Sequence, residues 1–252
     1  MSLIKRTDVP DWYIKNPYVK SGYRPSSTAP FAFFSAFEWH NDTLNIYSHL
    51  IPGIIWLYSG ISCLTEEYYI RANPLIQTVI LFSYFSGAFM GFASAYAHTF
   101  HIVDRRWASF SWKVDYAGII AVNLSHQILD SLILFKNPTM VLMLECMVAC
   151  MCMADVIVER TKINWGLIYP LLSSTVLTLP VALTDSPLSK YSVGCSAFVF
   201  IAGGVFFIGK FPERFWNPNG FMDNFNSHVW HHLCITAAIM CAFQSIPYLH
   251  QT

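Results

Sequence analysis

Charged side chains are scarce in this sequence of 252 residues. They make up 12% of the chain, about half of the share near 25% that is usual in soluble domains. Hydrophobic residues supply 54%, and the mean hydropathy is +0.42. This composition excludes an ordinary soluble domain and indicates a multi-pass protein of the plasma membrane or of an internal membrane.

The sequence also has no excess of charge of either sign. Its 15 lysines and arginines balance its 15 aspartates and glutamates, so no overall field attracts nucleic acid. The 7 cysteines are odd in number, lie almost all inside apolar stretches and lack the spacing of a zinc ribbon or knuckle. We therefore expect no nucleic-acid partner, no disulfide framework and no cysteine-based zinc site.

Several signals of other protein classes are missing. The first 30 residues contain no continuous apolar core, so we expect no cleavable signal peptide and insertion directed by the first membrane span. There is no glycine-rich phosphate loop, and no order of Ser, His and Asp that would indicate a serine nucleophile.

Long apolar runs are what the sequence does contain. A helix needs about 20 such residues to cross a bilayer. Runs of this kind occur at residues 44–64, 75–97, 114–135, 139–157, 166–183, 192–209 and 229–247. They predict an all-α membrane protein with a seven-transmembrane helix bundle.

The runs also predict the domain organisation. Residues 1–43 form an N-terminal segment, in which "FFSAFEWH" indicates a short amphipathic helix on the membrane surface, with Trp39 at the interface. Residues 44–247 form the transmembrane domain, and 248–252 a short tail. Twelve of the 15 basic residues fall on one side if the N-terminus is cytosolic. The positive-inside rule then predicts a cytosolic N-terminus and an exoplasmic or lumenal C-terminus.

Polar residues from separate spans are expected at one membrane depth, on the cytosolic side. The sequence places Ser94 and His98 at the end of the second span and Asp115 at the start of the third. The stretch "SHVWHH" opens the seventh span, and His49 lies near the start of the first. Four distant stretches thus bring histidine or aspartate to the same end of the bundle.

The histidine spacing favours a metal site. His228 and His232 are four residues apart, so on a helix their rings share one face and can bind one ion. With His98 they would leave one position of a tetrahedral Zn²⁺ open, as in catalytic zinc sites. His231 is compatible with the same helix face, so spacing does not choose between His231 and His232. Interfacial hydrogen bonding is the alternative role of such histidines.

The motifs "SGYRPSS", "NDTLNIYSHL", "SAYAHTF", "KVDYAGI", "FPERFW" and "SHVWHH" occur in the order found in one family. On these residues the chain resembles the progestin and adipoQ receptor family, which is similar to haemolysin III proteins. The resemblance implies zinc bound by His98, His228 and His232, and Asp115 bonded to a zinc-held water. His49 matches the family pattern but is not a zinc ligand there, so we expect it to have a structural role or to support the ligands.

The sequence departs from the family pattern just before the first span. It has Asn41-Asp42-Thr43 where many members have Asn-Glu-Thr, and this shorter acid changes the polar contacts expected of Asn45 and His49. Ser94 shares a helix face with His98 and is expected to touch the zinc-held water or Asp115.

Zinc held by three imidazoles favours hydrolysis. We expect Asp115 to act as the proton acceptor and a membrane lipid to be the partner. Because adiponectin-receptor-like members are reported to hydrolyse ceramide, we expect the substrate to be a ceramide-like lipid amide. Two alternatives are open. The zinc could be structural in a receptor for an extracellular or lumenal ligand, or the protein could act in zinc or sterol homeostasis.

Three further ionisable residues are predicted within the membrane. His126 and Asp130 are four residues apart in the third span, and a hydrogen-bonded pair or a functional site is expected there. Glu145, in the fourth span, has either a packing role or a place in a lipid tunnel.

Overall fold

The computed structural model describes residues 1–13, 16–135, 137–159, 168–169 and 187–251. Within these ranges the regular structure is helical, and an isolated bridge joins Ile4 to Tyr23. The long helices are α2 (Thr43–Ser62), α4 (Pro74–Phe100), α5 (Arg105–Leu134), α6 (Thr139–Val158), α8 (Pro187–Gly209) and α9 (Ser227–Phe243).

Six of the seven predicted spans overlap these long helices, although α5 begins nine residues before its predicted span and α9 ends four residues before the end of its own. The fifth, 166–183, lies almost wholly outside the described residues. Three helical stretches in the described part of the chain are long and apolar enough by themselves to cross a membrane: Pro74–Phe100, Thr139–Val158 and Ser192–Gly209. The seven-span count and the cytosolic side stay predictions from hydropathy and charge.

Side-chain caps begin the three helices that build the site. The Asn73 side chain accepts a hydrogen bond from the Ile76 amide at the start of α4. The Asp104 carboxylate accepts from the Arg106 and Trp107 amides at the start of α5. The Asn226 side chain accepts from the His228 amide at the start of α9. Because a cap satisfies amides that lack a partner within the helix, it determines where the helix begins.

Small residues allow the helices to approach closely. A Cβ atom on Gly91 of α4 would lie 2.7 Å from Cα of Gly53 in α2, and one on Gly118 of α5 would lie 2.8 Å from Cα of Met90 in α4. A Cβ on Gly203 of α8 would lie 2.8 Å from Cβ of Cys234 in α9. Small residues are typical where membrane helices pack through van der Waals contact.

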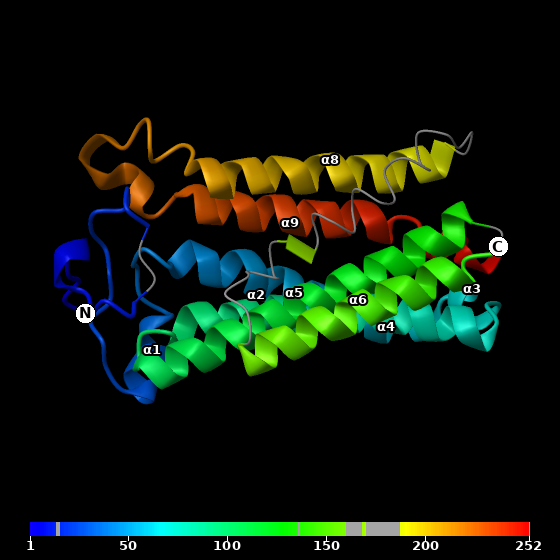
Figure 1. Ribbon diagram of the computed structural model, residues 1–252, viewed down its shortest axis with the longest axis horizontal. Helices are drawn as coiled ribbons and strands as arrows, with labels where there is room; N and C mark the ends of the chain where they lie inside the picture. Colours follow the sequence, from blue (N-terminus) through cyan, green and yellow to red (C-terminus); the bar gives the residue numbers. More distant parts are fainter. Residues whose placement is uncertain (14–15, 136, 160–167, 170–186, 252) are drawn as a thin grey trace.

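The N-terminal segment lies across one end of the bundle, beside the loop between α8 and α9, and the two chain termini are at opposite ends (Figure 1). It is tied to that loop by Asp223, whose carboxylate accepts hydrogen bonds from the Lys20 and Ser21 amides and from the Ser21 hydroxyl. The N-terminal segment is therefore a packed part of the structure.

The short helix of this segment is displaced from its predicted position. Helix α1 spans Ala29–Ser35, so Trp39 and Glu38 lie beyond its end. Pro30 near its N-terminus suits a helix start because proline lacks the amide hydrogen that would be unpaired there. Trp39 is 59% exposed, and Glu38 accepts a hydrogen bond from the N-terminal amine at 2.8 Å.

Candidate metal centre

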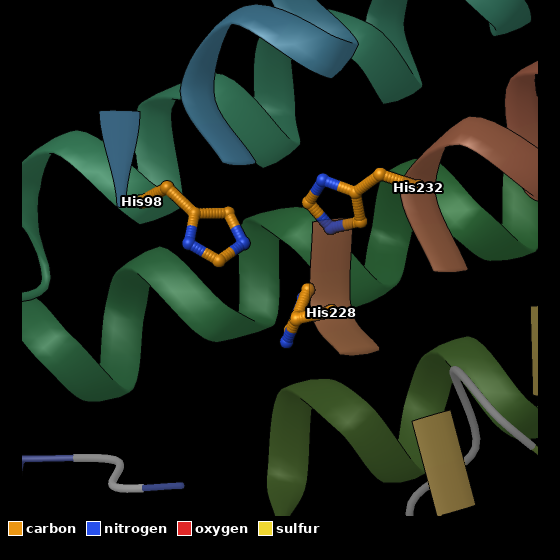
Figure 2. A group of neighbouring side chains, drawn as sticks. All are labelled: His98, His228 and His232. Atoms are coloured by element: carbon orange, nitrogen blue, oxygen red, sulfur yellow. The ribbon is translucent and has the colours of Figure 1, made fainter. Parts of the chain in front are cut away.

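Three histidines from two helices converge at the end of the bundle that the N-terminal segment covers. His98 lies in the last turn of α4, and His228 and His232 lie in the first two turns of α9. Figure 2 shows their rings around a common space, and one nitrogen from each ring lies within 4.8 Å of the others. The structure thus brings together the three residues that the family resemblance implied as ligands.

The Asp42 carboxylate orients the His98 ring. Nδ1 of His98 lies 3.2 Å from Oδ1 of Asp42. An ionised carboxylate can only accept a hydrogen bond, so Nδ1 carries the hydrogen. The other ring nitrogen, Nε2, is buried and has no hydrogen-bond partner among the described residues. This unpaired nitrogen is what a metal ligand requires.

The start of α2 orients the His232 ring in the same way. Nδ1 of His232 lies 3.2 Å from the backbone carbonyl oxygen of Asn45 and 3.0 Å from the hydroxyl of Ser48. Since the carbonyl can only accept, Nδ1 is the donor and Nε2 is left for a ligand. His49 stacks on this ring with 3.8 Å between ring centroids. His49 thus contacts a candidate ligand without being one of the three converging histidines.

Asp42 is the centre of a buried polar cluster. Its Oδ2 lies 3.1 Å from Nε2 of His101 and 3.4 Å from the guanidinium of Arg24. Burial alone would raise the pKa of Asp42, but the hydrogen bonds from His101 and His98 outweigh this effect and hold its pKa well below the usual value. Asp42 is therefore a carboxylate over the physiological pH range.

Arg24 joins the N-terminal segment to this cluster. Its side chain is fully buried, and it donates to the hydroxyl of Ser35 and to the carbonyl oxygens of His98 and Thr99. The sequence interpretation gave neither Arg24 nor Asp42 a role at the site. The sequence did contain one signal for them: Arg24 lies in the motif "SGYRPSS" and Asp42 in "NDTLNIYSHL". These motifs match the family pattern, but they do not show which residues Arg24 and Asp42 contact.

A main cavity of about 300 Å³ contains the histidine site. Ser94, His98 and Asp115 line it together with His228 and His232. Asp115 is 6% exposed and lies beside His98 and Ser94. Asn16 and Tyr23 line the cavity from the N-terminal segment; its apolar wall comes from Ile119, Val122 and Ile235. The predicted acid and hydroxyl thus share one cavity with the three imidazoles.

The remaining ionisable residues lie outside the three-histidine group. His231 also lines the main cavity, but its ring packs against Phe207 of α8, with 5.0 Å between the ring centroids, and it is not one of the three histidines whose nitrogens converge. His126 and Asp130 line a second, smaller cavity. Glu145 is 4% exposed and is not among the described residues that line these two cavities, so both roles expected for it stay predictions.

The geometry fits a zinc ion. Zinc bound by imidazole at about 2.0–2.1 Å in a tetrahedron places its nitrogen ligands about 3.3 Å apart. The three nitrogens lie within 4.8 Å of one another, so they would have to draw closer to reach this spacing. The residues that would hold zinc are His98, His228 and His232.

Comparisons with known proteins agree with this arrangement of membrane helices. The chain is 25% identical to heptahelical transmembrane protein 3 of Arabidopsis thaliana over 96% of its own length and 88% of that protein. It is 22% identical to membrane progestin receptor alpha of Sus scrofa over 96% of its own length and 75% of that receptor. It is 24% identical to the ADIPOR-like receptor IZH1 of Eremothecium gossypii over 95% and 82% of the two chains.

The family comparison covers almost all of the helical bundle. Residues 37–243 match the model of the family described as "Haemolysin-III related". This range includes Asp42, the three clustered histidines and Asp115. The chain is therefore a multi-pass integral membrane protein that belongs to the haemolysin-III-related family.

Proposed function

We propose that this protein is a zinc-dependent hydrolase of lipid amides. The observation that carries the proposal is the cavity in which Asp115 and Ser94 lie beside three converging histidines. A site that only had to clamp helices together would need the three histidines alone. A cavity with an additional buried acid beside them is what a reaction requires.

The residues of the chain have distinct roles in such a reaction. Bound by the histidines, zinc would supply a Lewis acid and lower the pKa of a coordinated water to about 7. Asp115 would accept the proton of the attacking water and pass it to the leaving amine. Ser94, one turn before His98, would donate a hydrogen bond that orients Asp115. Asp42 would hold the His98 ring in place through Nδ1.

The cavity walls indicate the class of substrate. Beyond the histidines most of the lining is apolar and comes from α5, α8 and α9, among them Ile119, Phe200 and Ile235, while Asn123 and Lys210 add polar groups. An acyl chain suits these walls, and an amide carbonyl would lie at the polar end beside Asp115. In a membrane-embedded bundle, a lipid amide of the ceramide type meets both requirements.

Fatty-acid release from ceramides and other lipid amides tests this proposal. The purified, zinc-loaded protein is compared with His98→Ala and Asp115→Ala, and the zinc content of each sample is measured. We expect His98→Ala to lose both zinc and activity, and Asp115→Ala to keep zinc but lose activity. His231→Ala is the matched histidine control and should retain zinc and most of the activity. Full activity in Asp115→Ala would contradict the proposed role of the acid.

A receptor with a structural zinc is the second candidate. Three hydrogen bonds to Asp223 tie the N-terminal segment to the α8–α9 loop, and Arg24 ties the same segment to the carbonyl of His98. A ligand that displaced this segment would therefore act directly on the histidine site. The names of the pig and Eremothecium relatives, a progestin receptor and an ADIPOR-like receptor, agree with this candidate.

The hydrolase and the receptor predict different results when fatty-acid release and ligand binding are measured on the same purified protein. Zinc-loaded wild-type protein that releases no fatty acid, but binds a steroid probe such as progesterone, would favour the receptor. Zinc or sterol homeostasis would instead appear as a change in cellular zinc or sterol content when the protein is removed.

A further inference from the structure

A second cavity of about 30 Å³ lies between α5, α8 and α9. It shares the lining residues Val122, Asn123, Phe200 and Ile235 with the main cavity, so the two spaces adjoin. Its polar lining comes from α5 and α8: Asn123, His126, Gln127, Asp130 and Ser196. A cavity of this volume holds one or two water-sized particles, since one water needs roughly 10–15 Å³.

The buried oxygens of this cavity lack partners. Gln127 is 3% exposed and Asp130 is 7% exposed. Oε1 of Gln127 and Oδ1 of Asp130 have no hydrogen-bond partner among the described residues. Asn123, which also lines this cavity, donates through Nδ2 to the carbonyl oxygen of Ile119 at 2.9 Å. The cavity thus presents unpaired oxygen acceptors and needs an occupant that satisfies them.

The predicted pairing of His126 with Asp130 is not present. Nε2 of His126 and Oδ1 of Asp130 are each unpaired, and the two side chains form no ion pair with each other. The reason lies in packing, because the His126 ring contacts Phe243 of α9, with 5.6 Å between centroids. Although His126 lies four residues before Asp130 on α5, it therefore provides no hydrogen bond to the Asp130 carboxyl group.

Asp130 needs a compensating charge to be an anion in this environment. Among the described side chains that line the second cavity there is no lysine or arginine. An uncompensated buried carboxylate is costly, so such groups are paired, bind a cation or hold a proton. One carboxylate with neutral amide and hydroxyl oxygens offers too little charge for the cages that divalent cations occupy, which are rich in carboxylates.

We propose that the second cavity binds a monovalent cation such as Na⁺, with Asp130 as its charged ligand and Gln127 as a neutral one. The ion would reach the cavity through the main cavity, past Asn123. It would link α5 to Ser196 of α8 and so tighten the bundle beneath the histidine site. This proposal does not depend on the reaction proposed for the main cavity.

The thermal unfolding of the purified, zinc-loaded full chain tests the proposal. The unfolding midpoint is measured while NaCl replaces choline chloride at constant ionic strength. A ligand that binds only the folded state raises the midpoint with the logarithm of its concentration. For a chain of this size we expect a rise of about 3–5 °C for each tenfold increase in Na⁺ above its Kd. Radioactive sodium should bind with one ion per chain.

Two variants make the result specific to this cavity. Asp130→Asn keeps the side-chain shape but removes the charge, so the midpoint should no longer depend on Na⁺, even if its absolute value rises. Glu67→Gln, at an acid on α3 (Glu67–Ile70) whose side chain is 74% exposed, should keep the wild-type dependence. A wild-type midpoint that does not respond to Na⁺ would overturn the proposal in favour of a protonated Asp130 with water. An unchanged dependence in Asp130→Asn would overturn it as well.

Discussion

Oδ1 of Asp42 lies 3.2 Å from Nδ1 of His98, and this contact joins the start of α2 to the end of α4. It determines the tautomer of His98, because the ring nitrogen that faces Asp42 carries the hydrogen and the other is left to bind a metal. The carboxylate also makes the imidazole more electron-rich and so a better metal ligand. A residue that precedes the first long helix thus determines the chemistry at the end of the second.

Asp42→Asn is predicted to weaken zinc binding about 10–100-fold, the range found for residues that support metal ligands. The asparagine can still accept a hydrogen bond from Nδ1, but it lacks the negative charge. Zinc affinity measured by competition with a chromogenic chelator checks this. Glu38→Gln, an exposed acid four residues earlier, is the control and should bind zinc as the wild type does. Equal affinity in the two variants would show that Asp42 does not support His98.

Arg24→Met is predicted to destabilise the protein by about 3–5 kcal/mol, because the buried carboxylate of Asp42 loses its cationic partner and the carbonyls of His98 and Thr99 lose the guanidinium donor. The control is Arg71→Met. Arg71 pairs with Glu67 on the surface, where its side chain is 67% exposed, and such pairs contribute about 0–1 kcal/mol. Unfolding in detergent measures both variants. A loss in Arg24→Met no larger than that in Arg71→Met would contradict the importance of the buried cluster.

Gly91→Ala is predicted to cost about 1–3 kcal/mol by overpacking. The new Cβ would lie 2.7 Å from both Cα of Gly53 and the carbonyl oxygen of His49, which are backbone atoms that cannot rotate away. Because His49 stacks on His232, we also expect weaker zinc binding. Gly204→Ala is the matched control, since its Cβ would meet nothing within 4 Å. Unfolding midpoint and zinc content are measured together; an unperturbed Gly91→Ala would show that α2 and α4 can separate freely.

Acid is predicted to destabilise the fold partly through His40. Burial and the nearby Arg24 lower the pKa of His40 from 6.5 to about 3. Between these pH values the unfolded chain binds a proton that the folded chain does not, so stability falls as pH falls through this window. One such group contributes a slope of about 1.4 kcal/mol per pH unit. In the metal-free protein, His40→Asn should reduce the slope of the free energy of unfolding against pH by the equivalent of about one proton. An unchanged slope would show that His40 does not contribute to the acid sensitivity.

Local sequence signals anticipated much of the helical framework. Apolar runs identified α2, α4, α5, α6, α8 and α9 because a chain buried in lipid must satisfy its backbone internally, which leaves a strong and continuous pattern. The caps at Asn73, Asp104 and Asn226 are also short-range features, as each bonds an amide two or three residues onward. These signals did not locate α1 correctly, because the aromatic stretch before the first span lacks the long, continuous apolar pattern of a membrane helix.

The sequence by itself determined that the protein is embedded in a membrane, that it is helical, and that His228 and His232 share a face of α9, because composition and helical periodicity act over short distances. Only the tertiary structure decided that Asp42 and Arg24 support His98, that His231 turns toward Phe207, and that His126 and Asp130 do not pair. Contacts of this kind depend on how helices distant in the chain are rotated and spaced. Close approach at glycines such as Gly91 controls that spacing, and no local pattern encodes it.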